Sequence, residues 1–299
     1  MNTPICDFVR DYAARRPDRL HMPGHKGRGA AEQLDITEIT GADVLYHPRG
    51  IILESEKNAA ALFGSRRTVY SAEGSSLSIR AMVFLAMQDA RKRGKTPRIA
   101  AGRNAHKVFI TAAALLDVQV QWLYPAQTGS LLTCQITPET LEEALGQGEP
   151  VTAVYITSPD YLGNVADISG LSRVCRRYGC LLLVDNAHGA YLGFLPEGQH
   201  PMDQGADMCC DSAHKTLPVL TGGGYLHISS HAPGELDSMA DSAMALFAST
   251  SPSYLILQSL DAANGILDGS WKRALHHAAA EWAAVKRACS SLATAFFIR

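Results

Sequence analysis

Cys180-Leu181-Leu182-Leu183-Val184 is an uninterrupted apolar run, and Asp185-Asn186-Ala187-His188-Gly189-Ala190 follows it directly. A short apolar run of this kind is typical of a parallel strand that is buried on both faces. Ligands of open α/β sheets bind at the carboxyl ends of such strands. The carboxylate of Asp185 is therefore predicted to meet a ligand, although an aspartate that caps the start of a helix is an equally good interpretation.

Similar apolar runs recur on both sides of this strand, and amphipathic helical patterns separate them. Strands are predicted at 68–71, 98–101, 118–123, 151–157, 180–184 and 208–210, with 224–228 returning along the sheet. Helices are predicted at 77–90, around 141–145 and 171–178, and as two long segments after residue 250 that are broken near 268–269. This alternation predicts an α/β fold with a mostly parallel, mixed sheet flanked by helices.

The segment Ser212-Ala213-His214-Lys215-Thr216-Leu217 is the second group with chemical potential. A lysine amine attacks a carbonyl only when it is deprotonated, and burial or nearby positive charge favours that form. Ser212 and His214 could hold an anion beside Lys215. Alone, Lys215 reads as a lysine on a loop. Together with Asp185, which could pair with a pyridine nitrogen, it favours covalent binding of an aldehyde cofactor such as pyridoxal phosphate.

A phosphate-binding site is predicted where Glu73-Gly74-Ser75-Ser76 precedes a helix. Free N–H groups at a helix start, with the Ser75 and Ser76 hydroxyls, can bind an anion, and glycine at 74 permits close approach. An ordinary serine N-cap is at least as common. No GxxxxGK[ST] pattern is present, so a nucleotide P-loop is not supported.

The segment Arg103-Asn104-Ala105-His106-Lys107 follows another predicted strand. The imidazole of His106 could stack on a flat heteroaromatic ring. Taken alone, a histidine here is more often a helix-start or surface residue.

Composition excludes several other classes of protein. The 299 residues carry a net charge of −2 with dispersed Lys and Arg, which argues against a nucleic acid partner. The seven cysteines form no CxxC pair and no metal-like spacing, so the sequence predicts no metal site and reduced thiols in a cytoplasmic protein. No signal peptide is predicted, and no apolar run approaches the roughly 20 residues that span a membrane.

The ordered motifs resemble the Orn/Lys/Arg decarboxylases, a family of fold-type I enzymes that use pyridoxal 5'-phosphate. The resemblance covers roughly residues 15–230. Its motifs are His21-Met22-Pro23-Gly24-His25-Lys26-Gly27, Asp35-Ile36-Thr37-Glu38, His47-Pro48-Arg49-Gly50, Gly74-Ser75-Ser76, Arg103-Asn104-Ala105-His106-Lys107, Thr157-Ser158-Pro159-Asp160-Tyr161-Leu162-Gly163, Asp185-Asn186-Ala187-His188-Gly189-Ala190 and Ser212-Ala213-His214-Lys215-Thr216-Leu217.

The resemblance implies a role for each site residue. Lys215 would form the covalent link to the cofactor, Asp185 would pair with the ring nitrogen, and His106 would stack on the ring. His188 would lie near the ring oxygen or the substrate carboxylate. The phosphate would be held at Gly74, Ser75, Ser76, Ser212 and His214.

The resemblance also implies the reaction and the partners. The substrate would be a basic amino acid, namely ornithine, lysine or arginine, decarboxylated to an amine of the polyamine pathway. Glu38, Asp43 and Glu54 are candidates for binding its distal cation, although surface or capping roles are more common for such acids. Loss of a different bond would give an aminotransferase or a lyase. A homodimer or higher homo-oligomer is expected, with the N-terminal arm at its interface.

The sequence and the resemblance together suggest how the chain is divided into domains, and they leave an alternative function open. Residues 1–45 are expected to form an N-terminal helix and arm, 46–235 a large domain that binds the cofactor, and 236–299 a helical linker with the start of a C-terminal region. Family members continue into a further small domain, whereas this sequence stops at Arg299. Glu73 stands where the family usually has asparagine, and Ala213 replaces a threonine or serine. The sequence is therefore expected to be either a fragment of an active enzyme or, as the alternative function, a truncated, non-catalytic paralogue or binding partner.

Overall fold

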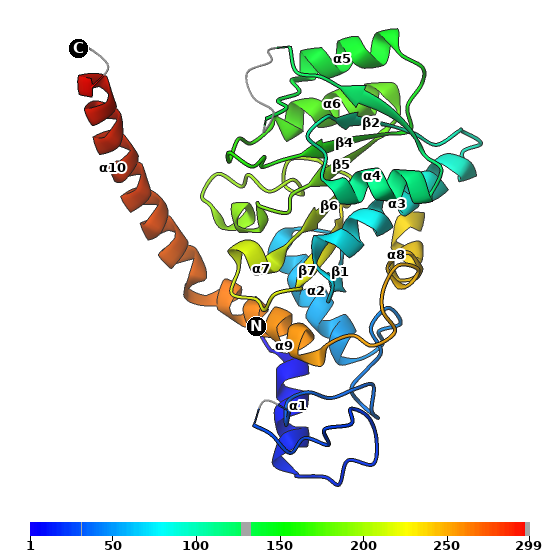
Figure 1. Cartoon of the computed structure of the whole chain (residues 1–299), viewed down its shortest axis with the longest axis vertical. Helices are drawn as coiled ribbons and strands as arrows, with labels where there is room; N and C mark the ends of the chain where they lie inside the picture. The colour runs from blue at the N-terminus through cyan, green and yellow to red at the C-terminus, as the bar shows by residue number, and fades with distance from the viewer. Residues whose placement is uncertain (31, 127–132, 297–299) are drawn as a thin grey trace.

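The computed structural model describes residues 1–30, 32–126 and 133–296 (Figure 1). Its centre is a seven-stranded sheet with strand order β1-β7-β6-β5-β4-β2-β3. The strands are β1 (Arg67–Ser71), β2 (Arg98–Gly102), β3 (Gln119–Leu123), β4 (Ala153–Thr157), β5 (Leu181–Asp185), β6 (Met208–Asp211) and β7 (Gly224–Ile228). Only β7 runs antiparallel to its neighbours, β1 and β6. The predicted mostly parallel, mixed sheet is confirmed, including the return along 224–228.

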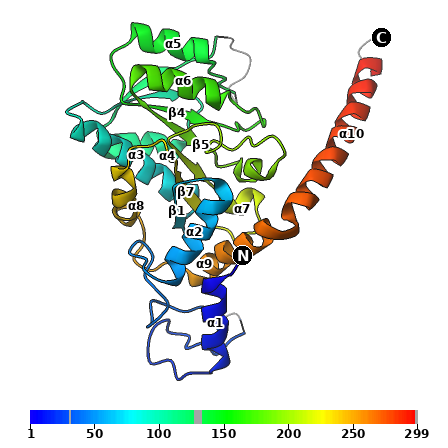
Figure 2. The ribbon, with the colours of Figure 1, turned by 180° about the vertical axis from the view of Figure 1, so that it is seen from behind.

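The helices before β6 are α1 (Pro4–Ala14), α2 (Ile51–Phe63), α3 (Gly74–Lys92), α4 (Lys107–Leu115), α5 (Pro138–Gln147), α6 (Ile168–Tyr178) and the short η1 (Ala190–Phe194). After β6 come α7 (Ala213–Thr216), α8 (Glu235–Ala245), α9 (Tyr254–Ile266), η2 (Leu267–Trp271) and α10 (Lys272–Phe296). The predicted break between the last two helices falls at Gly269, whose backbone is not helical. Beyond it, α10 extends away from the rest of the chain in both views (Figures 1 and 2).

Strand β5 is buried on both faces, as its apolar sequence predicts. Leu181 and Leu183 pack into the larger core, while Leu182 and Val184 pack into the second core. Because side chains alternate along a strand, one short run supplies both cores. Residues of α3, α4 and α8 belong to the first core and residues of α5 and α6 to the second. No helix of the described residues is long and apolar enough to cross a membrane.

A buried polar network ties α9 to the N-terminal half of the chain. Asp261 on α9 accepts hydrogen bonds from the Ser55 hydroxyl (2.6 Å) and the Cys6 backbone N–H (2.9 Å). Asn264, one turn later, donates to the Tyr70 hydroxyl (2.8 Å). These bonds satisfy polar groups that would be costly to leave unpaired in the interior.

A second buried network surrounds the carboxylate of Asp211, the last residue of β6. Its Oδ2 accepts from His200 Nε2 (3.0 Å) and His227 Nε2 (3.3 Å), and its Oδ1 accepts from Asn186 Nδ2 (2.6 Å). Burial alone would raise the pKa of Asp211, but the interactions with His200 and His227 outweigh it and hold that pKa well below its usual range. The network therefore joins the loops after β5 and η1 to the β6–β7 pair around one ionised group.

Glu56 on α2 is a buried carboxyl in a different state. Its Oε1 accepts from the Tyr70 backbone N–H (2.9 Å), but no described residue donates to its Oε2. Burial raises the pKa of Glu56 to about 8, although the Tyr70 hydrogen bond and the nearby Arg67 oppose that shift. The folded protein thus retains this proton at neutral pH.

We predict that Glu56→Gln weakens the decline of stability with rising pH. The folded-state pKa of about 8 lies above the ordinary value of 4.5, so the folded state holds a proton that the unfolded chain releases. Wild-type stability therefore falls as pH rises through this window. Between about pH 5 and pH 8 the free energy of unfolding should fall by at least about 1 kcal/mol less in the variant than in the wild type. Urea unfolding at both pH values measures the difference, and parallel pH profiles would contradict it.

We predict that Asp211→Ala destabilises the fold by about 3–5 kcal/mol, because it leaves buried imidazole and amide donors without their acceptor. Denaturant unfolding measures the loss. The matched control is Asp203→Ala at an exposed position nearby, which should change stability by less than about 0.5 kcal/mol. A loss in Asp211→Ala no larger than in the control would show that the network does not stabilise the fold.

Candidate active site

A cavity of about 300 Å³ lies where β4, β5 and β6 end and α3 begins. The structure brings all nine residues proposed for the site to its wall: Gly74, Ser75, Ser76, His106, Asp185, His188, Ser212, His214 and Lys215. They come from loops that are far apart in the sequence. The carboxyl ends of parallel strands share one edge of a sheet, which explains why these loops meet.

Asp185 is the last residue of β5 and is almost completely buried. Its Oδ2 accepts from the Tyr155 hydroxyl (2.9 Å), and its Oδ1 accepts from the Ala187 backbone N–H (3.2 Å). Burial, followed by the nearby Asp185 carboxylate, raises the pKa of Tyr155 well above its usual value, so the phenol stays a donor. Asp185 does not cap an α-helix, because the next helical segment is η1, which begins at Ala190 after Gly189.

The Lys215 amine lies against the imidazole of His188, with 3.0 Å between Nζ and Nε2. Desolvation, and then the charge of Lys215, lowers the pKa of His188. The Asp185 carboxylate and the Pro159 backbone oppose this shift. The ring of Tyr161 packs beside the imidazole, with 5.3 Å between centroids. His188 is therefore a neutral ring at pH 7, and its Nε2 can accept a hydrogen bond from the lysine amine.

The start of α3 has the features of an anion-binding site. Gly74 has a φ of +67°, and no side chain caps the helix. The first turn of a helix presents N–H groups without intrahelical partners. The Ser212 hydroxyl donates to that of Ser75 (2.7 Å), and His214 Nδ1 lies 3.0 Å from the Gly223 carbonyl. A Cβ at Gly224 would lie only 3.1 Å from the Ser75 backbone nitrogen. Glycine at this position therefore allows the start of β7 to lie close to the start of α3.

These features fit a phosphorylated heteroaromatic aldehyde. The uncapped N–H groups and serine hydroxyls match a phosphate, and the amine of Lys215 matches an aldehyde. Two further polar atoms of residues on the cavity wall, Thr157 Oγ1 and Asn104 Nδ2, are buried and have no partner among the described residues. Buried polar groups of this kind ordinarily have a partner, which a bound molecule or water would supply.

His106 is a helix-start residue that also faces the candidate site, and its stacking on a ring stays a prediction. It is the N-cap of α4, where Nδ1 accepts from the Val108 backbone N–H (3.3 Å), and it also lines the cavity. Sequence reasoning missed Tyr155, the donor to Asp185. A tyrosine inside an apolar strand reads as core, and its contact with Asp185 becomes visible only when β4 and β5 are paired.

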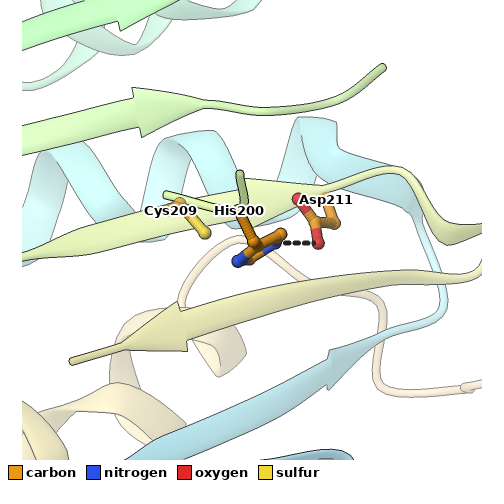
Figure 3. A group of neighbouring side chains, drawn as sticks. All are labelled: His200, Cys209 and Asp211. Atoms are coloured by element: carbon orange, nitrogen blue, oxygen red, sulfur yellow. Dashed lines mark hydrogen bonds and ion pairs between the residues drawn. The ribbon is translucent and has the colours of Figure 1, made fainter. Parts of the chain in front are cut away.

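One group of potential metal ligands was not predicted by cysteine or histidine spacing. His200, Cys209 and Asp211 have ligand atoms within 4.8 Å of one another (Figure 3). Hydrogen bonds already engage both ring nitrogens of His200, because Nδ1 accepts from the Met202 backbone N–H (3.3 Å) and Nε2 donates to Asp211. All three side chains are completely buried. The geometry is that of a satisfied structural network.

Comparison with known proteins gives the family. Residues 3–299 match the family model for the Orn/Lys/Arg decarboxylase major domain. The chain is 32% identical over 277 residues to the uncharacterized protein YaaO of Bacillus subtilis, covering 88% of this chain and 56% of that protein. It is 30% identical over 275 residues to an arginine decarboxylase of Bacillus cereus, covering 87% of this chain and 58% of that protein. The chain thus spans little more than half the length of these relatives.

Solved structures show the same fold. Lysine decarboxylase A from Pseudomonas aeruginosa superposes with a TM-score of 0.76 at 20% identity, covering 91% of this chain and 41% of that one. The constitutive lysine decarboxylase of Escherichia coli gives a TM-score of 0.71 at 22% identity, covering 91% of this chain and 42% of that one. The fold is the large domain of fold-type I enzymes, and the chain belongs to the Orn/Lys/Arg decarboxylase family, whose members depend on pyridoxal phosphate.

Proposed function

We propose that this chain binds pyridoxal 5'-phosphate in the cavity and decarboxylates a basic amino acid. The observation that carries the proposal is the position of the Lys215 amine, 3.0 Å from the neutral His188 and in one cavity with Asp185 and an uncapped helix start. When bound, the cofactor supplies an aldehyde for covalent attachment and a ring that accepts the electrons released as carbon dioxide leaves.

Each residue of the cavity wall has a separate role in the proposed reaction. His188 Nε2 accepts a hydrogen bond from Lys215 Nζ and so orients the amine within the cavity. Asp185, held by Tyr155, keeps a proton at the ring nitrogen by offering it a fixed negative charge. Ser75, Ser76, Ser212 and His214 bind the phosphate and so fix the position of the ring. His106, on the cavity wall, would stack on the face of the ring.

The substrate class rests on the family and its relatives. Three of the proteins described above are named as arginine or lysine decarboxylases. We propose for this chain only the reaction that they share. We assign the cofactor to residues 46–235 and the arm to residues 1–45. We also propose a homodimer, because the arm and the segments beside the cavity expose apolar side chains such as Leu20, Met22 and Leu162.

We predict that adding pyridoxal phosphate to the purified protein gives a visible absorbance band, and that borohydride traps the cofactor on Lys215. Lys215→Ala should abolish the band, because no other described residue of the cavity wall carries a primary amine. Peptide mass analysis identifies the modified residue. A protein that shows no lysine-dependent band is a non-catalytic paralogue, which is the alternative function.

We predict that Asp185→Asn retains the trapped cofactor but slows carbon dioxide release at least about 100-fold, because the amide cannot stabilise a protonated ring nitrogen. Release is measured with ornithine, lysine and arginine. The Asn side chain still offers an oxygen to the Tyr155 hydroxyl, which makes this variant nearly isosteric. Amino-group transfer or retro-aldol products without carbon dioxide would instead identify another fold-type I reaction.

A further inference from the structure

The proposed function requires an anionic partner for the cationic end of the substrate, and the acids suggested by the sequence do not provide it. Glu38, Asp43 and Glu54 do not line the cavity. The Asp43 carboxylate is used locally, since it accepts from backbone N–H groups at the start of α2, including Gly50 (2.7 Å). Glu54 accepts a hydrogen bond from Asn2. Both acids therefore have structural roles.

Two carboxylates do line the cavity, and only one of them is available. Asp185 is buried, and the proposed function assigns its charge to the ring nitrogen of the cofactor. Glu73 is exposed at the N-cap position of α3, directly before Gly74. Its Oε1 accepts from the Ser249 backbone N–H (2.7 Å), between α8 and α9, while no described residue donates to its Oε2. Glu73 thus presents an accessible negative charge at the cavity wall.

The position of this charge matters as much as its exposure. A carboxylate beside a bound phosphate raises the energy of the complex through like-charge repulsion. A substrate cation placed between the phosphate and the Glu73 carboxylate attracts both anions. The electrostatic contribution of Glu73 to the complex then becomes favourable. The other titratable side chains of the cavity wall are the bases His106, His188, His214 and Lys215 and the phenol of Tyr161, and none of them is a carboxylate.

We propose that Glu73 is the residue that selects a cationic side chain in the substrate. The inference rests on the proposed function and adds a specificity determinant to it. The carboxylate binds the distal ammonium or guanidinium through Oε2, while its bond to Ser249 fixes its orientation. In the free protein the same charge weakens phosphate binding, so Glu73 couples the two ligands.

Glu73→Gln isolates the charge, because its amide oxygen can still accept from the Ser249 N–H. Glu73→Ala removes both the charge and the hydrogen bond. Glu197→Gln, at an exposed position outside the cavity, is the control with the same change in net charge. Two readouts apply to each variant. Absorbance titration gives the Kd for pyridoxal phosphate, and the spectral change of the loaded protein gives the Kd for lysine and for uncharged norleucine.

The expected result is that Glu73→Gln binds pyridoxal phosphate more tightly than wild type and loses about tenfold affinity for lysine, with norleucine unchanged. Glu197→Gln should match wild type in both readouts. If Glu73 only holds the Ser249 segment, Glu73→Gln will match wild type and only Glu73→Ala will differ, which overturns the inference. An unchanged preference for lysine over norleucine in Glu73→Gln also overturns it.

Failure of the proposed function gives a different pattern. A wild-type protein without a Lys215-dependent band removes the proposed function and this inference together. A wild-type protein with the band, but with no difference between its affinities for lysine and norleucine, removes the inference alone. The cofactor titration needs no turnover, so it reports on Glu73 even in a chain that releases no carbon dioxide.

Discussion

The candidate site depends on the register of three parallel strands. Thr157 at the end of β4 pairs with Asp185 at the end of β5, and Asp185 pairs with Cys210 in β6. Asp211 is one residue further on and therefore points to the opposite face of the sheet. This alternation directs Asp185 to the cavity and Asp211 to the buried network with His200 and His227. A shift of β6 by one residue would turn Asp211 toward the face that carries Asp185 and would break the buried network.

Much of the fold was predictable, because the strands are short apolar runs and their carboxyl ends must converge. Gly269 also marked the break after α9 correctly. The site residues could be predicted to lie close together for the same reason, since most of them follow a predicted strand. The Asp211 network could not be predicted, because His200 and His227 lie on a loop and on a strand whose contacts depend on tertiary packing. Nothing in the local sequence separates these histidines from ordinary core residues.

Burial alone does not distinguish functional carboxyl groups in this protein. Asp185 and Asp211 accept hydrogen bonds at both oxygens, whereas Glu56 has a donor at only one. The unpaired oxygen explains why desolvation dominates at Glu56 and raises its pKa to about 8, while donors keep Asp211 ionised. Asp185 differs from Asp211 because it borders the cavity of the candidate site, and it differs from Glu56, which borders a separate pocket, because donors hold both of its oxygens. Access to a ligand, combined with fixed donors, is what qualifies a buried acid for chemistry.

Glu73 shows how a residue that looks unfavourable can become useful when two ligands are considered together. Viewed with the cofactor alone, its charge opposes phosphate binding at Gly74–Ser76. Viewed with a cationic substrate, the same charge contributes to binding, and the phosphate contributes too. Because coupling between two bound ligands is reciprocal, a cation that is attracted by the phosphate must also strengthen retention of the cofactor. The bond from Ser249 makes this coupling possible, because it holds the carboxylate at the wall before either ligand arrives.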